Sequence, residues 1–383
     1  QLSTNTGAIS SIPNNNIFFI ENNKVIIEVV AQAGQYAALL AYLQSQGLTN
    51  IIYNGANSLI ITGSFPIANL QNLNQQGSLI RYCRPLYQPL TKAGLTTTQG
   101  DIAMRSNIVK SGYNVAGSGV KIGILSDSYN TIPNDPALAD VSNGDLPGVG
   151  NPNGNLTPIQ VLKDYPYGRR TDEGRAMLQI VHDVAPKSTL AFRTGFISPG
   201  DFGEGIRGLA AAGCKVIVDD ITYITEPFYT DGVVSKAVDE VVASGVTYVS
   251  AAGNYGSKSY ESTFNPATAP VGIIGQAHSF GGGQVFQKLS LTPGTYTIVL
   301  QWEGNVYSLG NNNGTQTDLD IFLVNRDGSS LFGFNRNNLN GDPIEVLPFT
   351  VNENTATNIM IVKAAGSNVK FKYIIFRGEG TID

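Results

Sequence analysis

The chain has 383 residues and a formal net charge of −5 at pH 7, and only 14% of its residues are charged, against roughly a quarter in typical globular proteins. This length is too great for one ordinary core and predicts two or three domains. The acidic balance and the lack of any Lys/Arg cluster argue against nucleic acid as a partner, and no apolar run approaches the roughly 18 residues of a membrane span.

The composition also indicates where the protein works. Few charges together with many Asn, Gly, Ser and Thr residues favour a secreted or cell-surface protein over a cytosolic one. No signal peptide is recognisable, as expected of a processed chain or of a sequence chosen to start at Gln1.

The first predicted domain covers residues 24–87, after an N-terminal tail of residues 1–23. Apolar alternation, helical spacing and turn residues predict the order strand, helix, strand, strand, helix, strand, which is the ferredoxin-like order. The predicted segments are, in order, residues 24–32, 36–47, 50–54, 58–65, 68–77 and 78–87, with the turn at 54–57.

A linker rich in Pro, Thr and Gly follows at residues 88–100. The two cysteines, Cys83 and Cys214, each lie at the edge of an apolar segment, where we expect free thiols rather than a disulfide. Neither has the spacing of a metal site.

Residues 101–279 alternate strands and helices in the manner of an α/β domain. Uninterrupted apolar runs predict parallel strands that helices cover on both faces. The predicted strands are residues 119–127, 188–195, 214–223 and 246–254, and the predicted helices are residues 172–184, 201–213 and 231–245. Ligands of such sheets bind beyond the carboxyl ends of the strands, where Asp127, Asp220 and Asn254 fall.

Residues 280–383 consist of short strands separated by turns and predict an antiparallel β-sandwich. Asp318, Asp320, Asp327 and Asp342 lie in it, and we leave open that they hold a structural calcium ion, although their spacing matches no EF-hand loop. Acids at strand ends and turns are also common without a metal. Apart from this possible calcium ion, we expect no cofactor.

Three segments of the α/β region resemble the core of a subtilisin-like serine peptidase: VKIGILSDSYN at 120–130, TDEGRAMLQIVHDVAP at 171–186 and VTYVSAAGNYG at 246–256. The resemblance implies that Asp127 is the catalytic acid and that Asn254 donates to the oxyanion. It also implies a polypeptide substrate, an inhibitory propeptide at residues 24–87, which we favour over an unrelated docking module, and a jelly-roll-like accessory domain at 280–383.

Glu173 stands where subtilisins have the catalytic histidine, and sedolisins, another branch of the same fold, use a Glu on this helix. Residues 173, 177, 180 and 184 share one helical face, so we expect a buried carboxyl with a raised pKa. If Asp127 approaches Glu173, the two acids share a proton, and the enzyme cleaves best below neutrality. The alternative is a plain helix start, where the dipole favours acids.

Other polar residues fit less directly. His182 lies nine residues after Glu173, on the opposite side of the helix, and we expect it to interact with the helix C-terminus; His278 is expected to be structural. Alternation along 214–223 places one of Asp219 and Asp220 inward, and Asp220 is better placed. It would orient Glu173 or bind a basic group of the substrate, and the sequence does not choose between them.

The chain contains no G-T-S-x-A-x-P, the subtilisin segment that bears the nucleophile. We therefore expect a partial α/β domain with an inserted sandwich, a nucleophilic Ser downstream of Asp383, and no cleavage by residues 1–383 alone. The alternative is a pseudopeptidase whose fold serves protein or carbohydrate binding at a surface.

Overall fold

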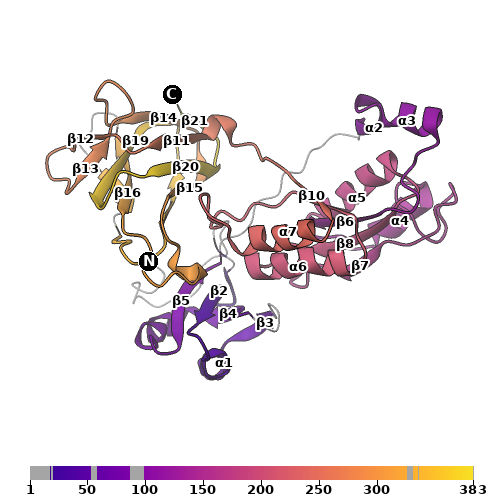
Figure 1. Cartoon of the computed structure of the whole chain (residues 1–383), viewed down its shortest axis with the longest axis horizontal. Helices are drawn as coiled ribbons and strands as arrows, with labels where there is room; N and C mark the ends of the chain where they lie inside the picture. Colours follow the sequence, from indigo (N-terminus) through magenta and orange to yellow (C-terminus); the bar gives the residue numbers. More distant parts are fainter. Residues whose placement is uncertain are drawn as a thin grey trace.

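The computed structural model describes residues 18, 20–52, 58–86, 99–325, 331–334 and 336–382. They form a small N-terminal unit, an α/β unit and an antiparallel β unit, which Figure 1 shows as three separate bodies. The turn predicted at 54–57 and most of the predicted linker lie outside the described residues. Within these ranges, none of the helices combines the length and hydrophobicity needed to cross a membrane.

The N-terminal unit has the predicted element order. Its elements are β1 (Ile20–Glu21), β2 (Lys24–Ala31), α1 (Tyr36–Ser45), β3 (Thr49–Ile52), β4 (Ile60–Pro66), the 3₁₀ helix η1 (Ile67–Gln75) and β5 (Ile80–Pro85). β2 is central, with β4 on one side and β5 and the short β1 on the other, and β3 pairs with β4, all antiparallel. The ferredoxin-like strand order therefore holds. Alternate residues of β2, Val25, Ile27 and Val29, are buried against Leu39 and Leu43 of α1.

The α/β unit contains one parallel sheet. Its elements are α2 (Gly100–Ala103), α3 (Ser106–Tyr113), β6 (Lys121–Ser126), α4 (Pro136–Asn143), β7 (Gln160–Lys163), α5 (Glu173–Val184), β8 (Thr189–Thr194), α6 (Pro199–Ala211), β9 (Val216–Asp219), α7 (Val233–Ala243) and β10 (Thr247–Ser250). The strand order is β10-β9-β6-β8-β7, and every pair is parallel. The strands and helices predicted from the apolar runs are present, while β7 and α2 to α4 were not predicted.

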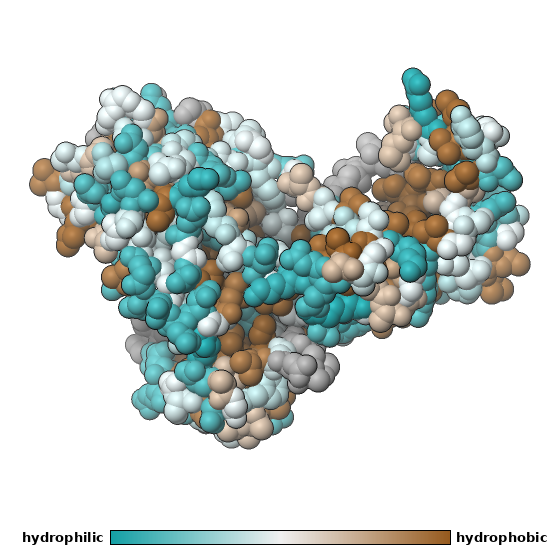
Figure 2. Space-filling view, in the orientation of Figure 1, coloured by the Kyte–Doolittle hydropathy of each residue, from teal (hydrophilic) through white to brown (hydrophobic). Residues whose placement is uncertain are grey.

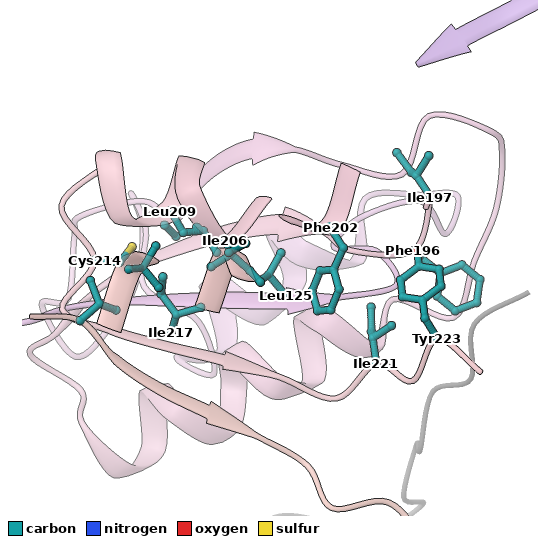
Figure 3. Close-up of a cluster of buried hydrophobic side chains, with 14 of the residues drawn as sticks. Leu125, Phe196, Ile197, Phe202, Ile206, Leu209, Cys214, Ile217, Ile221 and Tyr223 are labelled. Carbon is teal, nitrogen blue, oxygen red and sulfur yellow. The ribbon is translucent and has the colours of Figure 1, made fainter. Parts of the chain in front are cut away.

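One hydrophobic cluster of the α/β unit lies between this sheet and α6, and another includes Ile124 of β6 and Leu178 of α5. Figure 3 shows Ile206 and Leu209 of α6 beside Leu125 of β6 and Ile217 of β9, with Cys214 at one end and Phe196 and Tyr223 at the other. Cys214 and Cys83 are both free thiols, as predicted. This packing fixes where the strands end relative to one another.

The β unit has two antiparallel sheets. Its elements are the 3₁₀ helices η2 (Gly256–Lys258) and η3 (Tyr307–Leu309) and the strands β11 (Ser259–Thr263), β12 (Pro266–Thr268), β13 (Gln276–His278), β14 (Gln287–Leu291), β15 (Gly294–Trp302), β16 (Asp318–Asn325), β17 (Leu331–Phe334), β18 (Ile344–Val351), β19 (Thr355–Ala365), β20 (Lys370–Arg377) and β21 (Gly380–Ile382). One sheet has the order β11-β20-β15-β18, and the other contains β12, β13, β19, β14 and β21 with β16 and β17.

The boundary predicted at residue 280 is wrong, because β11 pairs with β20 and β13 pairs with β19. The strand pairing of this unit therefore begins at Ser259. The segment 259–279 has little apolar alternation of its own, so the sequence does not indicate that it belongs to the β unit. Only its pairing with β20 and β19 shows this.

Candidate functional site

Three neighbouring strands end at the same edge of the parallel sheet, and polar residues follow each of them. β10, β9 and β6 are adjacent, with Ser250 opposite Asp219 and Asp219 opposite Leu125. Ser126, Asp220 and the loop containing Asn254 therefore follow from the same edge. The N-terminus of α5, which starts at Glu173, meets this edge.

Asp127 holds the start of α5 in place. Its carboxylate accepts hydrogen bonds from the backbone N–H groups of Thr171 and Glu173, each at 2.9 Å, and from that of Ser128 at 2.5 Å, and the Thr171 hydroxyl donates to it as well. A carboxylate with this many donors has no oxygen left for sharing a proton. The expected proton sharing between Asp127 and Glu173 is therefore wrong.

Asp172 fixes the neighbouring loop. Although burial raises its pKa, hydrogen bonds from Thr131, Ser128 and Ile132 lower it to about 2. Its Oδ1 accepts from the Ser128 and Thr131 hydroxyls at 2.7 Å each, and its Oδ2 lies 2.6 Å from Arg175 Nη1. Asp172 is thus a permanent anion that stabilises the loop before α5.

Gly174 lets α5 approach the sheet closely. A Cβ atom at this position would lie 2.3 Å from the ring of Phe192 on β8 and 2.6 Å from the backbone oxygen of Ser128. Only glycine fits here without displacement. In the D-E-G string, Asp172 therefore anchors the loop and Glu173 is the candidate base. Gly174 allows the close packing that brings this base to the strand ends.

Glu173 is a buried carboxyl at the edge of the sheet. It is 7% exposed, and its Oε2 accepts a hydrogen bond of 2.8 Å from the hydroxyl of Ser126. Burial raises its pKa to about 7; the Ser126 hydrogen bond opposes the rise, and Asp220 and Asp127 add to it. The prediction of a raised pKa agrees with this structure.

The reason for that burial differs from the one expected. The buried positions of α5 are Glu173, Gly174, Leu178 and His182, whereas Ile180, expected on the same face as Glu173, is 40% exposed. Glu173 is buried because it sits at the edge of the sheet, and it does not belong to an apolar stripe that runs the length of the helix.

Asp220 supplies the second carboxyl of the pair. It lies close enough to Glu173 to raise the pKa of that carboxyl, so of the two roles left open by the sequence, the structure favours an interaction with Glu173. Asp219 faces elsewhere, since its carboxylate accepts from Ser250 Oγ at 3.0 Å and from the N–H of Ile221 at 3.2 Å. Glu173 and Asp220 together are called the acid pair below.

Asn254 lies in the exposed loop after β10. Gly253 before it has φ +71°, and a Cβ there would lie 2.7 Å from the Tyr255 ring, so this turn requires glycine. The pKa of Tyr255 is raised by burial and, to a smaller extent, by the charge of Asp220. The residue after Asn254 is therefore within electrostatic reach of the acid pair.

Both histidines lie away from the acid pair. His182 lies in the last turn of α5, on its buried face beside Asn155, and burial lowers its pKa. His278 is structural, as predicted. Its Nδ1 accepts from the N–H of Asn265 at 3.0 Å, its Nε2 contacts the Tyr260 hydroxyl, and burial lowers its pKa to about 4.

The acids considered for calcium mostly serve the β unit itself. Asp318 accepts the N–H of Asn338 at 3.0 Å, and Asp342 accepts the N–H of Ser308 at 2.8 Å. Across the ranges that the structure describes, no three Asp, Glu, His or Cys side chains are grouped so that they could hold a metal. Asp327 lies outside those ranges.

Sequence reasoning missed Ser126, the donor to Glu173, and Thr171 and Ser128, which bind the carboxylates of Asp127 and Asp172. The sequence Ser126-Asp127-Ser128 could have indicated these hydrogen bonds. Polar residues on both sides of a strand-end acid indicate that its oxygens already have partners.

Comparisons with known proteins give weak likenesses. No family model and no curated protein matches the sequence. The epidermin leader peptide processing serine protease EpiP of Staphylococcus aureus is 16% identical, with a TM-score of 0.39 over 62% of this chain and 62% of its own. The CspB protease of Clostridium perfringens is 10% identical, with a TM-score of 0.41 over 74% of this chain and 70% of its own.

The chain thus spans less than two thirds of the length of EpiP. EpiP is a serine protease and CspB is a protease, but TM-scores below 0.5 carry no argument about the fold or the activity of this chain.

Proposed function

We propose that this chain is the greater part of a secreted, subtilisin-like serine endopeptidase in which Glu173 is the general base. The observation that carries the proposal is the acid pair: a buried carboxyl with a raised pKa, in contact with a second carboxyl, at the carboxyl end of a parallel sheet. Perturbed carboxyl pairs at such an edge are typical of catalytic centres. Secretion rests on the composition alone, and no cofactor is required.

In this mechanism Glu173 takes the proton of a serine hydroxyl while the serine oxygen attacks the carbonyl carbon of a peptide bond. The side-chain amide of Asn254 donates to the oxyanion that forms on the carbonyl oxygen. Glu173 then returns the proton to the leaving amine, and water releases the acyl group by the same steps. Asp127 acts as a positioning residue because it holds the N–H groups at the start of α5.

The pH dependence follows from the charge that Glu173 must carry. Only the ionised carboxyl accepts a proton, and its pKa is raised to about 7. Activity should therefore rise as the pH increases through about 7. The acidic optimum expected from the sequence depended on Asp127 sharing the proton, and Asp127 is occupied by other donors.

The serine is proposed to lie on a further α/β segment that packs against this unit. β10 is an edge strand whose Val249 is 50% exposed, and Ile102, Ile108 and Ile180 on α2, α3 and α5 are 70%, 54% and 40% exposed. Figure 2 shows hydrophobic surface in the hollow beneath the α2–α3 arm. Apolar surface of this kind favours a covering segment.

The test is to translate the natural reading frame beyond Asp383, look for the G-T-S-x-A-x-P segment, and assay the resulting protein on unfolded polypeptide. We expect cleavage, a loss of about 10²–10⁴-fold in kcat/KM for Glu173→Gln, and no loss for Glu353→Gln, at an exposed position in the β unit. Absence of the segment, or an unaffected Glu173→Gln variant, would refute the proposal and favour a non-catalytic binding protein.

A further inference from the structure

Two loops lead from the carboxyl ends of the parallel strands to the β unit. The first loop, residues 220–232, follows β9 and ends just before α7, and the second loop, residues 251–258, joins β10 to β11. Asp220 begins the first loop, and Asn254 lies in the second. Figure 1 shows the chain crossing from β10 to the β unit. The contacts that these loops make with the β unit therefore bear on both residues.

One aromatic ring of the β unit contacts both loops. Phe376 of β20 is 6% exposed, and the centre of its ring lies 4.9 Å from that of Tyr255 and 6.3 Å from that of Phe228. The Tyr255 pair is edge-to-face, an arrangement that aromatic rings favour. The same buried cluster contains Ile224 of the first loop and residues of β15, β18 and β20, namely Val299, Ile344, Val346 and Ile374. The two loops therefore cover one face of this sheet.

Polar contacts attach the same loops to the β unit. Gln301 of β15 is 4% exposed; its Nε2 donates to the backbone oxygen of Glu226 at 3.0 Å, and its Oε1 accepts the N–H of Phe228 at 2.9 Å. In the second loop, Lys258 donates to the backbone oxygen of Gly378 at 3.1 Å. Each loop thus has an apolar and a polar attachment to the β unit.

The α/β unit holds the two loops unequally. Ile221 and Tyr223 of the first loop are buried in the α/β core cluster, and the Tyr223 hydroxyl donates to the backbone oxygen of Gly195 at 2.7 Å. In the second loop, residues 251–254 are mostly exposed and follow an edge strand, and the first buried residue is Tyr255. Asn254 therefore depends on the β unit for its position more than the first loop does.

We propose that Phe376 is a positioning residue, which holds Tyr255 against the β unit and thereby sets where Asn254 lies relative to the acid pair. A hydrogen-bond donor stabilises a developing oxyanion best when it is held in place before the reaction begins. Fixing the residue directly after Asn254 removes backbone freedom that an exposed loop otherwise keeps. The β unit, which the sequence predicted to be an accessory domain, then forms part of the site.

The anchoring of the second loop can be measured on residues 1–383. Tyr255→Ala removes the loop's ring and leaves every residue of the β unit unchanged, and Phe376→Leu removes the ring on the other side. We expect hydrogen exchange, followed by mass spectrometry, to become about two- to tenfold faster in residues 251–258 of both variants, because the loop opens more often. Unchanged exchange of this segment in either variant would overturn the proposal.

Two further variants separate this contact from a general weakening of the β unit. Tyr255→Phe keeps the ring, so residues 251–258 should exchange as in the parent chain. Phe349→Ala is the matched control, because it removes a ring of the same sheet that stacks on Tyr296 at 5.1 Å. It should leave the exchange of residues 251–258 unchanged. If Phe349→Ala accelerated this exchange as much as Phe376→Leu does, Phe376 would have no specific role.

The effect on the oxyanion rests on the proposed function and is tested in the protein completed beyond Asp383. Phe376→Leu should lower kcat with little change in KM, and it should cause no further loss in the Asn254→Ala variant, because both changes act through the same donor. Additive losses would contradict the positioning role. Absence of cleavage by the parent protein would refute the peptidase proposal but not the anchoring of Asn254, which hydrogen exchange decides.

Discussion

Glu173 and Asp127 are both buried carboxyls near the end of β6, yet their surroundings assign them different tasks. Asp127 receives backbone N–H donors, whereas Glu173 receives one hydroxyl and faces Asp220. The oxygens of Asp127 accept hydrogen bonds from several donors, whereas burial and the neighbouring acid Asp220 raise the pKa of Glu173. Asp127 can therefore position the start of α5, and Glu173 can accept and donate a proton.

Glu173→Gln should stabilise the fold at alkaline pH. Since the folded pKa is raised from 4.5 to about 7, the stability linked to this group is complete below pH 4.5 and is lost as the pH rises through about 7. Removing the charge should therefore raise the free energy of unfolding at pH 8 by about 3 kcal/mol, and hardly change it at pH 4.5.

Urea unfolding at both pH values measures this difference, with Glu353→Gln as the exposed control. Equal stability of Glu173→Gln and the parent chain at pH 8 would show that Glu173 is not a strained buried acid.

The position of Glu173 and its raised pKa were predictable from the sequence, because an acid at the start of an amphipathic helix next to a strand end has few environments available. That Asp220 is the acid beside Glu173 was not predictable. Asp127 and Asp220 both follow apolar strands, and only the course of the backbone after each strand determines which carboxylate meets N–H groups and which meets Glu173.

At the scale of elements, the predicted strands β6, β8, β9 and β10 are present because their apolar runs can be buried only inside a covered parallel sheet. The buried face of α5 was predicted less well. The buried residues of the helix are Glu173, Gly174, Leu178 and His182. A glycine and a histidine do not look apolar in a sequence, so close approach of the helix backbone was not foreseen.

Gly174→Ala should disturb the site through packing alone. The added methyl group would overlap the Phe192 ring and the Ser128 backbone oxygen, and overpacking of this kind costs about 1–3 kcal/mol. Thermal unfolding measures the loss. Gly112→Ala is the matched control, because a Cβ atom at this position on α3 meets nothing within 4 Å. A Gly174→Ala variant as stable as the parent would contradict the close packing.

For the whole molecule, buried acids set the response to pH. In the β unit, burial raises the pKa of Asp320 to about 7, with a contribution from Asp318, and burial raises that of Glu345 to about 8 against the opposing charge of Arg336. Glu173 and Glu226 are raised to about 7. All four groups bind protons more tightly when folded, so stability is greatest near pH 4–5 and falls toward pH 9.

Glu345→Gln should reduce this fall, because Glu345 is fully buried and Arg336, at 3.8 Å, is 62% exposed. The difference between the free energies of unfolding at pH 5 and pH 9 should shrink by about 1–3 kcal/mol, as urea titrations at the two pH values would report. If the free energy of unfolding of Glu345→Gln fell as steeply from pH 5 to pH 9 as that of the parent chain, Glu345 would not be a source of the pH dependence.

The general base is tested most directly by the ionisation of Glu173 itself. The carboxyl carbons of the intact chain can be followed by ¹³C NMR from pH 3 to pH 9, with Glu173→Gln assigning the signal. We expect a pKa of about 7 for Glu173, and a lower value in Asp220→Asn because the neighbouring negative charge is removed. A pKa near 4.5 in the parent chain, or no change in Asp220→Asn, would contradict this expectation.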